Sequence, residues 1–208
     1  MDGTIIDSAP SILKGLQESA HKRKYQLIQP LTASLIGPPL KKTFQTLTGE
    51  NSNDKLDILM ADFKDYYDNQ GIESTKAYPG IIESLKKLKA DNFELMIATN
   101  KRLIPTLKII KLLKLTSFFS EIYSIDKSPE NFFASKFEML GSLINKSKLI
   151  ASNSFYIGDR IEDQEASERN GLNSITATWG YGDYRDLSYY SKVVHSPLEL
   201  CSIFKKTP

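Results

Sequence analysis

The feature that most constrains this chain is the alternation of short apolar runs with helical segments that begins after residue 80. The apolar runs are residues 93–100, 118–126, 153–159 and 173–179. Helical periodicity marks the segments before, between and after them, at residues 81–92, 101–115, 135–149, 162–171 and 196–204. Short apolar runs bounded by turn residues are typical of buried strands. Strand–helix alternation therefore predicts an α/β, Rossmann-like parallel sheet with helices on both faces.

Residues 11–69 follow a different pattern. Their segments 11–23, 32–49 and 53–69 are amphipathic and rather polar, and no run among them is typical of a strand. Gly37-Pro38-Pro39 interrupts the middle segment, because proline cannot continue a helix interior. We expect an inserted helical bundle. The predicted domains are an α/β core at residues 1–10 and 77–208 and a helical domain at residues 11–76.

Composition excludes several functional classes. The 208 residues carry a net charge of only +2, which is too small to suggest a nucleic-acid partner. No apolar run reaches membrane-spanning length, and the first residues lack a signal-peptide pattern. One cysteine and two histidines exclude an internal disulfide and argue against a structural zinc site. We expect a cytoplasmic protein with no nucleic-acid or membrane partner; its oligomeric state is not indicated.

Polar residues follow two of the predicted strands. Thr99 and Asn100 end the first apolar run, and Asp159 ends the third, with Asp163 four residues later. The carboxyl ends of parallel strands meet at one edge of a sheet, where α/β proteins bind ligands. Each of these residues alone is explained more simply, as a turn residue or a helix cap. Their combination indicates a binding site.

Two further residues complete a recognisable set. Lys136 lies near the start of the helix between two of these strands, and Asp2 lies in a turn with Gly3 and Thr4. Carboxylates are suitable ligands for Mg²⁺, and a lysine with hydroxyl and N–H donors can neutralise phosphate oxygens. Lys136 alone would be read as a surface lysine and Asp2 as a turn residue. The order and spacing of the whole set are more specific than any member.

This set resembles the four motifs of the haloacid dehalogenase-like hydrolases. The stretch MDGTIIDS matches the second half of the DxDGT motif, and MIATN matches the second motif. ASKFEML carries the lysine of the third motif, and GDRIED matches the fourth, GDxxxD. The stretches IGPPL and WGYG resemble the phosphoglycolate-phosphatase-like branch, whose helical cap corresponds to the helical insertion. The resemblance covers nearly the whole chain.

The resemblance implies a catalytic role for four residues. In the family the first Asp of DxDGT attacks phosphorus and forms an aspartyl-phosphate. Asp2 would then protonate the leaving alcohol and activate the hydrolytic water. Thr99 and the backbone N–H of Asn100 would hold phosphate oxygens, and Lys136 would neutralise the nucleophile and the phosphate. The expected substrate is a small phosphorylated metabolite admitted under the cap.

The resemblance also implies a Mg²⁺ cofactor. Its expected ligands are the backbone carbonyl of Asp2 and the carboxylate of Asp159, directly or through water, with Asp163 supporting the site. An aspartate at position 2 favours phosphoryl transfer over carbon–halogen chemistry, since the metal-independent dehalogenases are not expected to have it. The aromatic segment 179–190 is expected to form a loop packed near the site.

The nucleophile of the motif falls two residues before Asp2, outside the 208 residues. Met1 then corresponds to the variable residue of DxDGT, and the strand expected before it is also outside the chain. Three explanations stay open: a true start upstream, a truncated gene, or a beginning lost in preparation. Under each, this polypeptide is expected to be a poor phosphatase, because loss of a catalytic residue costs orders of magnitude.

Two other functions stay open. The chain could be a non-catalytic member of the family that binds a phosphate ligand or a protein partner, for which the absent nucleophile is the only support. It could also be a different Rossmann-like enzyme that binds a nucleotide. No GxGxxG or GxxxxGK[ST] stretch follows any predicted strand, which disfavours the second alternative.

Overall fold

The computed structural model describes residues 1–126 and 133–204. The chain forms two compact units, described separately below: Met1–Asp7 with Ala77–Pro208, and Ser8–Lys76. The predicted division into domains, with boundaries after residues 10 and 76, stays a prediction, since compactness alone does not establish independent folding.

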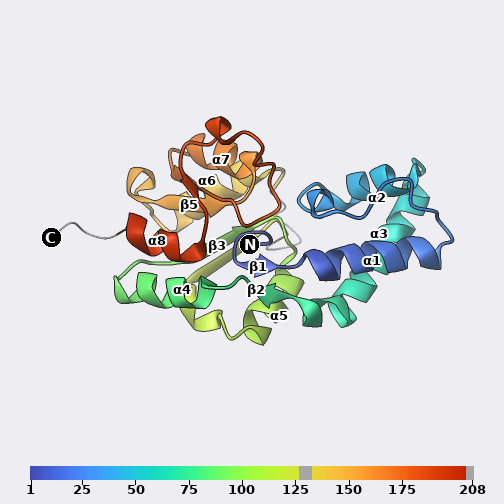
Figure 1. Cartoon of the computed structure of the whole chain (residues 1–208), viewed down its shortest axis with the longest axis horizontal. Helices are drawn as coiled ribbons and strands as arrows, with labels where there is room; N and C mark the ends of the chain where they lie inside the picture. The colour runs from blue at the N-terminus through green and yellow to red at the C-terminus, as the bar shows by residue number, and fades with distance from the viewer. Residues whose placement is uncertain (127–132, 205–208) are drawn as a thin grey trace. The chain divides into compact units, whose positions relative to one another are not determined.

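The first unit contains every strand predicted from the sequence. Each of them lies inside one of the four apolar runs, and they are β3 Met96–Thr99, β4 Glu121–Ser124, β5 Phe155–Gly158 and β6 Asn173–Ala177. β3 pairs with β4, and β5 pairs with β6, all in parallel (Figure 1). The predicted parallel α/β fold is confirmed.

Helices cover both faces of these strands. They are α4 Ile81–Ala90, α5 Leu103–Leu112, α6 Lys136–Lys146, α7 Ile161–Glu168 and α8 Pro197–Ile203. Successive side chains of β3 point to opposite faces of the sheet. Ile97 packs with Ile81 of α4 and Ile110 of α5, whereas Ala98 packs in a cluster with residues of α6 and α7. Figure 1 shows α4 and α5 on one side of β3 and α6 and α7 on the other.

Three short strands were not predicted. They are β1 Ile6–Asp7, β2 Lys76–Ala77 and β7 Val193–Val194. β1 pairs with β2, and β7 pairs with β6. Two residues are too few to show a period, so pairing with a distant segment decides such strands.

Among the described residues, β3 and β5 belong to separate sheets. A side chain connects them: the Tyr156 hydroxyl on β5 donates to the carbonyl of Ala98 on β3 at 3.2 Å.

The second unit is helical from Ala9 to Ser74 apart from its connecting segments. Its helices are α1 Ala9–Lys22, a 3₁₀ turn at Ala33–Leu35, α2 Leu40–Thr48, α3 Asn53–Asn69 and a 3₁₀ turn at Gly71–Ser74. The predicted interruption at Gly37-Pro38-Pro39 separates the first 3₁₀ turn from α2. Phe63 is central to the core, since its ring stacks on Tyr67 at 5.5 Å and meets the edge of Phe44 at 6.3 Å.

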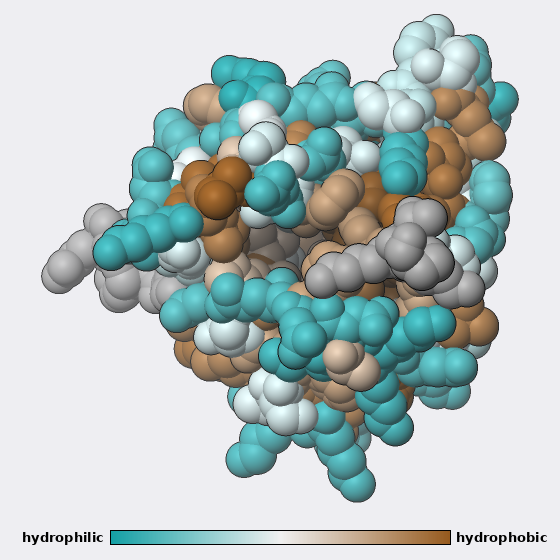
Figure 2. Space-filling model, turned by 90° about the vertical axis from the view of Figure 1, so that its left-hand side faces the viewer, coloured by the Kyte–Doolittle hydropathy of each residue, from teal (hydrophilic) through white to brown (hydrophobic). Residues whose placement is uncertain are grey.

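The surface is mostly hydrophilic on the face shown in Figure 2, with smaller and separate hydrophobic patches. Cys201, which the sequence places on an apolar helix face, is buried at 5% exposure. In the described part of the chain, no helix combines the length and the hydropathy that crossing a bilayer requires.

Candidate active site

A tight turn at residues 2–6 forms one wall of the site. The Gly3 N–H donates to the carbonyl of Ile6 at 3.0 Å, and Asp2 forms a bridge to the same residue. Gly3 has a φ of +74°, and a Cβ at this position would lie 2.1 Å from Oδ2 of Asp159. A glycine is therefore required here for two reasons: the left-handed backbone and the close approach of the carboxylate. The turn places Thr4 beside Asp159.

Asp159 lies at the centre of the site, directly after β5, and is 4% exposed. Its Oδ1 accepts a hydrogen bond from the Thr4 hydroxyl at 3.2 Å, and its Oδ2 accepts one from the Tyr181 backbone N–H at 2.9 Å. Burial raises the pKa of Asp159 above its ordinary value, and the neighbouring carboxylate of Asp163 raises it further. A bound cation would relieve both effects.

Asp163 holds together the loop that follows β5. Its Oδ2 accepts hydrogen bonds from the backbone N–H groups of Asp159 and Arg160, both at 3.1 Å. Its Oδ1 forms an ion pair with the ammonium of Lys136. Burial favours a higher pKa for Asp163, but the Lys136 charge and these hydrogen bonds outweigh burial, and the pKa is lowered. Asp163 is therefore an ionised partner of Lys136 and a cap of α7.

Lys136 is the first residue of α6, whose N-terminus is capped by the Ser135 side chain accepting from the Glu138 N–H at 3.2 Å. Burial favours a lower pKa for Lys136, but Tyr156 and Asp163 have the larger combined effect, and its pKa is raised. The structure thus places this lysine against the GDxxxD loop, although the two are 27 residues apart in the sequence.

Asp2 is paired with a residue that sequence reasoning missed. Lys101 Nζ lies 3.0 Å from Oδ1 of Asp2, and the lysine side chain is only 8% exposed. The Thr99 hydroxyl accepts a hydrogen bond from the Lys101 N–H at 3.1 Å, which fixes the turn after β3. Thr99 is buried, whereas Asn100 is exposed. The available signal was the position of Lys101 directly after Thr99-Asn100.

The predicted aromatic loop packs on the site. The Trp179 Nε1–H donates to the carbonyl of Thr4 at 3.0 Å, and the Tyr184 hydroxyl donates to the carbonyl of Asp159 at 2.7 Å. Gly180 permits this packing, since a Cβ there would lie 2.2 Å from the Gly3 carbonyl oxygen and 2.4 Å from Cβ of Asp159. The sequence indicated the location of the loop but none of these contacts.

The structure thus joins Thr4, Asp159, Asp163 and Lys136 through direct contacts, whereas the carboxylate of Asp2 pairs with Lys101. Over residues 1–126 and 133–204, no three acidic, histidine or cysteine side chains converge as a metal-ligand group. Mg²⁺ is commonly held by one or two carboxylates, with water and substrate phosphate completing its shell. The Asp159 carboxylate, which is buried at the carboxyl end of β5, supplies hard oxygens of that kind.

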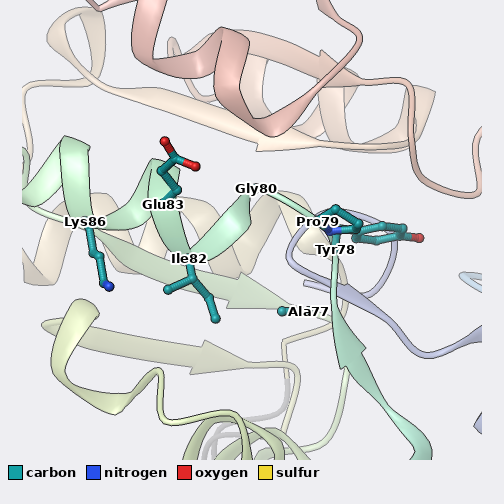
Figure 3. A pocket seen from close by; sticks show the side chains of 7 residues that line it. All are labelled: Ala77, Tyr78, Pro79, Gly80, Ile82, Glu83 and Lys86. Atoms are coloured by element: carbon teal, nitrogen blue, oxygen red, sulfur yellow. The ribbon is translucent and has the colours of Figure 1, made fainter.

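A pocket of about 570 Å³ lies along the start of α4 and contains none of the predicted site residues. Its lining residues are Ala77, Tyr78, Pro79, Gly80, Ile82, Glu83 and Lys86. In Figure 3 the side chains of Ile82 and Lys86 extend to one side of the helix, Glu83 extends to the opposite side, and Tyr78 points away from all three. No convergent polar groups accompany this pocket, so it is not the candidate active site.

Comparison with known proteins identifies the family. Residues 1–177 match the family model described as haloacid dehalogenase-like hydrolase. The chain belongs to this family. It is 29% identical to a phosphoglycolate phosphatase of Rhodobacter capsulatus over 188 residues, which covers 87% of this chain and 83% of the relative. The resemblance inferred from the motifs, including the phosphoglycolate-phosphatase-like branch, is confirmed.

Solved structures agree with this assignment. A haloacid dehalogenase-like family hydrolase from Streptococcus pneumoniae superposes with a TM-score of 0.85 at 26% identity, covering 99% of this chain and 95% of that one. A predicted phosphatase from Clostridium acetobutylicum also gives a TM-score of 0.85, at 28% identity, with 98% and 94% coverage. The haloacid dehalogenase-like α/β fold is therefore shared along nearly the whole length of the chain.

Proposed function

We propose that this protein is a Mg²⁺-dependent phosphomonoesterase that acts on a small phosphorylated metabolite through an aspartyl-phosphate. The observation that carries the proposal is the contact chain Thr4–Asp159–Asp163–Lys136, which brings buried carboxylates and a partly buried ammonium into one site. The phosphoglycolate phosphatases among the relatives support a substrate of this class. A cytoplasmic location is part of the proposal and is supported by the single buried cysteine.

The proposed roles are those that the resemblance to the family implies. Asp2 is the acid and base, and its carboxylate is positioned by the ion pair with Lys101. The Thr99 hydroxyl and the Asn100 backbone N–H hold phosphate oxygens at the end of β3. Lys136 compensates negative charge in the site while it holds Asp163. When bound, Mg²⁺ would be held by Asp159 and the Asp2 backbone carbonyl and would neutralise charge on the phosphate.

We further propose that turnover requires an aspartate nucleophile directly before Met1, as the DxDGT motif of the family implies. The second candidate is a non-catalytic protein that binds phosphate or a protein partner with the same residues. The two differ in one measurable respect. A chain that carries an upstream apolar segment ending in Asp before Met1 gains phosphatase activity if the first is right and gains none if the second is right.

The metal site is tested by calorimetric titration of Mg²⁺ into the wild-type chain and into Asp159→Asn. We expect the substitution to weaken Mg²⁺ binding at least about tenfold, since it removes the charged ligand. Asp183→Asn is the matched control, because Asp183 is an exposed carboxylate in the same unit that pairs with Arg185. Equal Mg²⁺ affinity in the wild type and in Asp159→Asn would contradict the assignment of the metal ligand.

Turnover is tested with a panel of small phosphate monoesters, among them 2-phosphoglycolate, on the 208-residue and the extended chains. We expect orders of magnitude more activity in the extended chain, with loss in excess EDTA. Equal and high Mg²⁺-dependent turnover by both chains would refute the nucleophile argument. Activity that survives EDTA would refute the metal requirement.

A further inference from the structure

Tyr181 makes two contacts at opposite ends of the residue. Its backbone N–H donates to Oδ2 of Asp159 at 2.9 Å. Its hydroxyl donates to Oδ1 of Asp7 at 2.8 Å. One residue of the aromatic loop therefore touches both the central carboxylate and the end of β1.

A third contact involves Tyr78. Burial raises the pKa of Tyr78 above its ordinary value, and a hydrogen bond with Tyr181 raises it further. Figure 3 shows the Tyr78 side chain directed away from Ile82 and Lys86 of α4. The Tyr181 hydroxyl therefore donates to Asp7 and lies close enough to Tyr78 to raise its pKa.

Both partners of Tyr181 lie next to a crossing, which is a point where the chain passes from one unit to the other. Asp7 is the last residue of the first unit before the crossing to Ser8, and Tyr78 directly follows Ala77, where the chain returns to this unit. The two crossings are held beside each other, because β1 pairs with β2 and the Tyr78 N–H donates to the carbonyl of Ile5 at 3.1 Å. Tyr181 is therefore in contact with both crossings.

The backbone of Tyr181 is held on either side. Trp179 is fixed by its hydrogen bond to Thr4, and the Tyr184 hydroxyl donates to the carbonyls of Asp159 and Ala177 at 2.7 and 2.9 Å. A change at the Asp159 carboxylate thus acts on a loop that is anchored on both sides of Tyr181. The tyrosine ring is the part of that loop that reaches the crossings.

We propose that Tyr181 is a positioning residue that couples the state of the Asp159 carboxylate to both crossings between the units. This deepens the proposed function, since it rests on Asp159 being the ligand-binding carboxylate. A ligand on Asp159 fixes the Tyr181 backbone, and the tyrosine hydroxyl then orders Asp7 and Tyr78.

A double-mutant cycle in metal-free protein tests the coupling. Amide hydrogen exchange is measured at residues 5–8 and 76–80 in the wild type, Asp159→Ala, Tyr181→Phe and the double variant, all in EDTA. Phenylalanine keeps the ring and the backbone N–H and removes only the hydroxyl. We expect each single substitution to speed amide exchange at the crossings about tenfold. The exchange rate in the double variant should exceed that in either single variant by no more than about twofold. If the increases in exchange rate of the two single variants multiply in the double variant, the proposal is overturned.

Mg²⁺ provides a second readout that a merely structural residue would not change. In the wild type we expect Mg²⁺ with orthophosphate to slow exchange at the crossings. In Tyr181→Phe this slowing is lost, while the Kd for Mg²⁺ stays within about twofold, because the N–H to Asp159 remains. Tyr189→Phe is the control, since its ring belongs to the same loop and the residue is 70% exposed. Slowing that persists in Tyr181→Phe would overturn the coupling.

The two proposals fail differently. If the wild type binds no Mg²⁺, the proposed metal site fails, and the metal-free cycle alone decides the coupling. If Mg²⁺ binds and the cycle is multiplicative, the metal site stands and the role of Tyr181 falls.

Discussion

Replacing Lys136 with methionine removes the ammonium that faces Asp163 and leaves a carboxylate that is 5% exposed without its cation. Removing one partner of a buried ion pair costs about 3–5 kcal/mol of unfolding free energy. Because Asp163 keeps two backbone N–H donors at 3.1 Å, we expect a loss of unfolding free energy at the lower end of this range, about 3 kcal/mol. For a chain of this size each kcal/mol lowers Tm by about 2–4 °C, which gives a decrease of about 6–12 °C.

The assay is thermal and urea unfolding at pH 7 in EDTA, with Lys146→Met as the control on the exposed end of the same helix. The pKa of Asp163 is lowered on folding, so its stabilisation is present above its unfolded pKa and is lost as pH falls through the folded value. The difference in unfolding free energy between the wild type and Lys136→Met should therefore become smaller in acid. The double variant Lys136→Met/Asp163→Asn should recover part of the loss. A decrease in Tm no larger than that of Lys146→Met would refute the reasoning.

Two further predictions concern other parts of the chain. Gly180→Ala would place a Cβ 2.2 Å from the Gly3 carbonyl oxygen, and we expect a loss of about 1–3 kcal/mol in urea unfolding; an unchanged midpoint would contradict the close packing. In the second unit, a hydrogen bond from Arg23 lowers the pKa of Asp62, so Asp62→Asn should cost about 1 kcal/mol at pH 7. Because the stabilisation by a carboxylate of lowered pKa is lost as pH falls through the folded value, that difference in unfolding free energy should shrink in acid; a difference independent of pH would exclude the ion pair as its cause.

Much of the fold could be predicted from the sequence because its signals are local. The runs that contain β3 to β6 are apolar and bounded by turn residues, and Gly37-Pro38-Pro39 interrupts the helical insertion as expected. The motif residues could be named because their order and spacing along the chain are distinctive. Thr99 ends β3, Lys136 begins α6 and Asp159 follows β5. The sequence pattern of these elements can be recognised without any partner segment. Their roles in catalysis and metal binding stay predictions.

Contacts between distant segments could not be predicted in this way. Lys101 meets Asp2 across 99 positions, Thr4 meets Asp159 across 155, and Tyr181 meets Asp7 across 174. None of these pairs has a local signature, because a lysine or tyrosine in a loop has the same sequence context whether its partner is water or a buried carboxylate. The two-residue strands β1, β2 and β7 also have no recognisable sequence pattern, since only pairing with another segment defines them.

The sequence by itself therefore determined the layered α/β arrangement, the helical insertion and the set of polar residues at the strand ends. Only the tertiary structure decided the partners of each member of that set: Asp163 pairs with Lys136, and Asp2 pairs with Lys101. Asp159 accepts hydrogen bonds from Thr4 and Tyr181. The physical reason is that periodicity is fixed by neighbours along the chain. The charge state and the partners of a buried group are instead fixed by whichever segments folding brings within hydrogen-bonding distance.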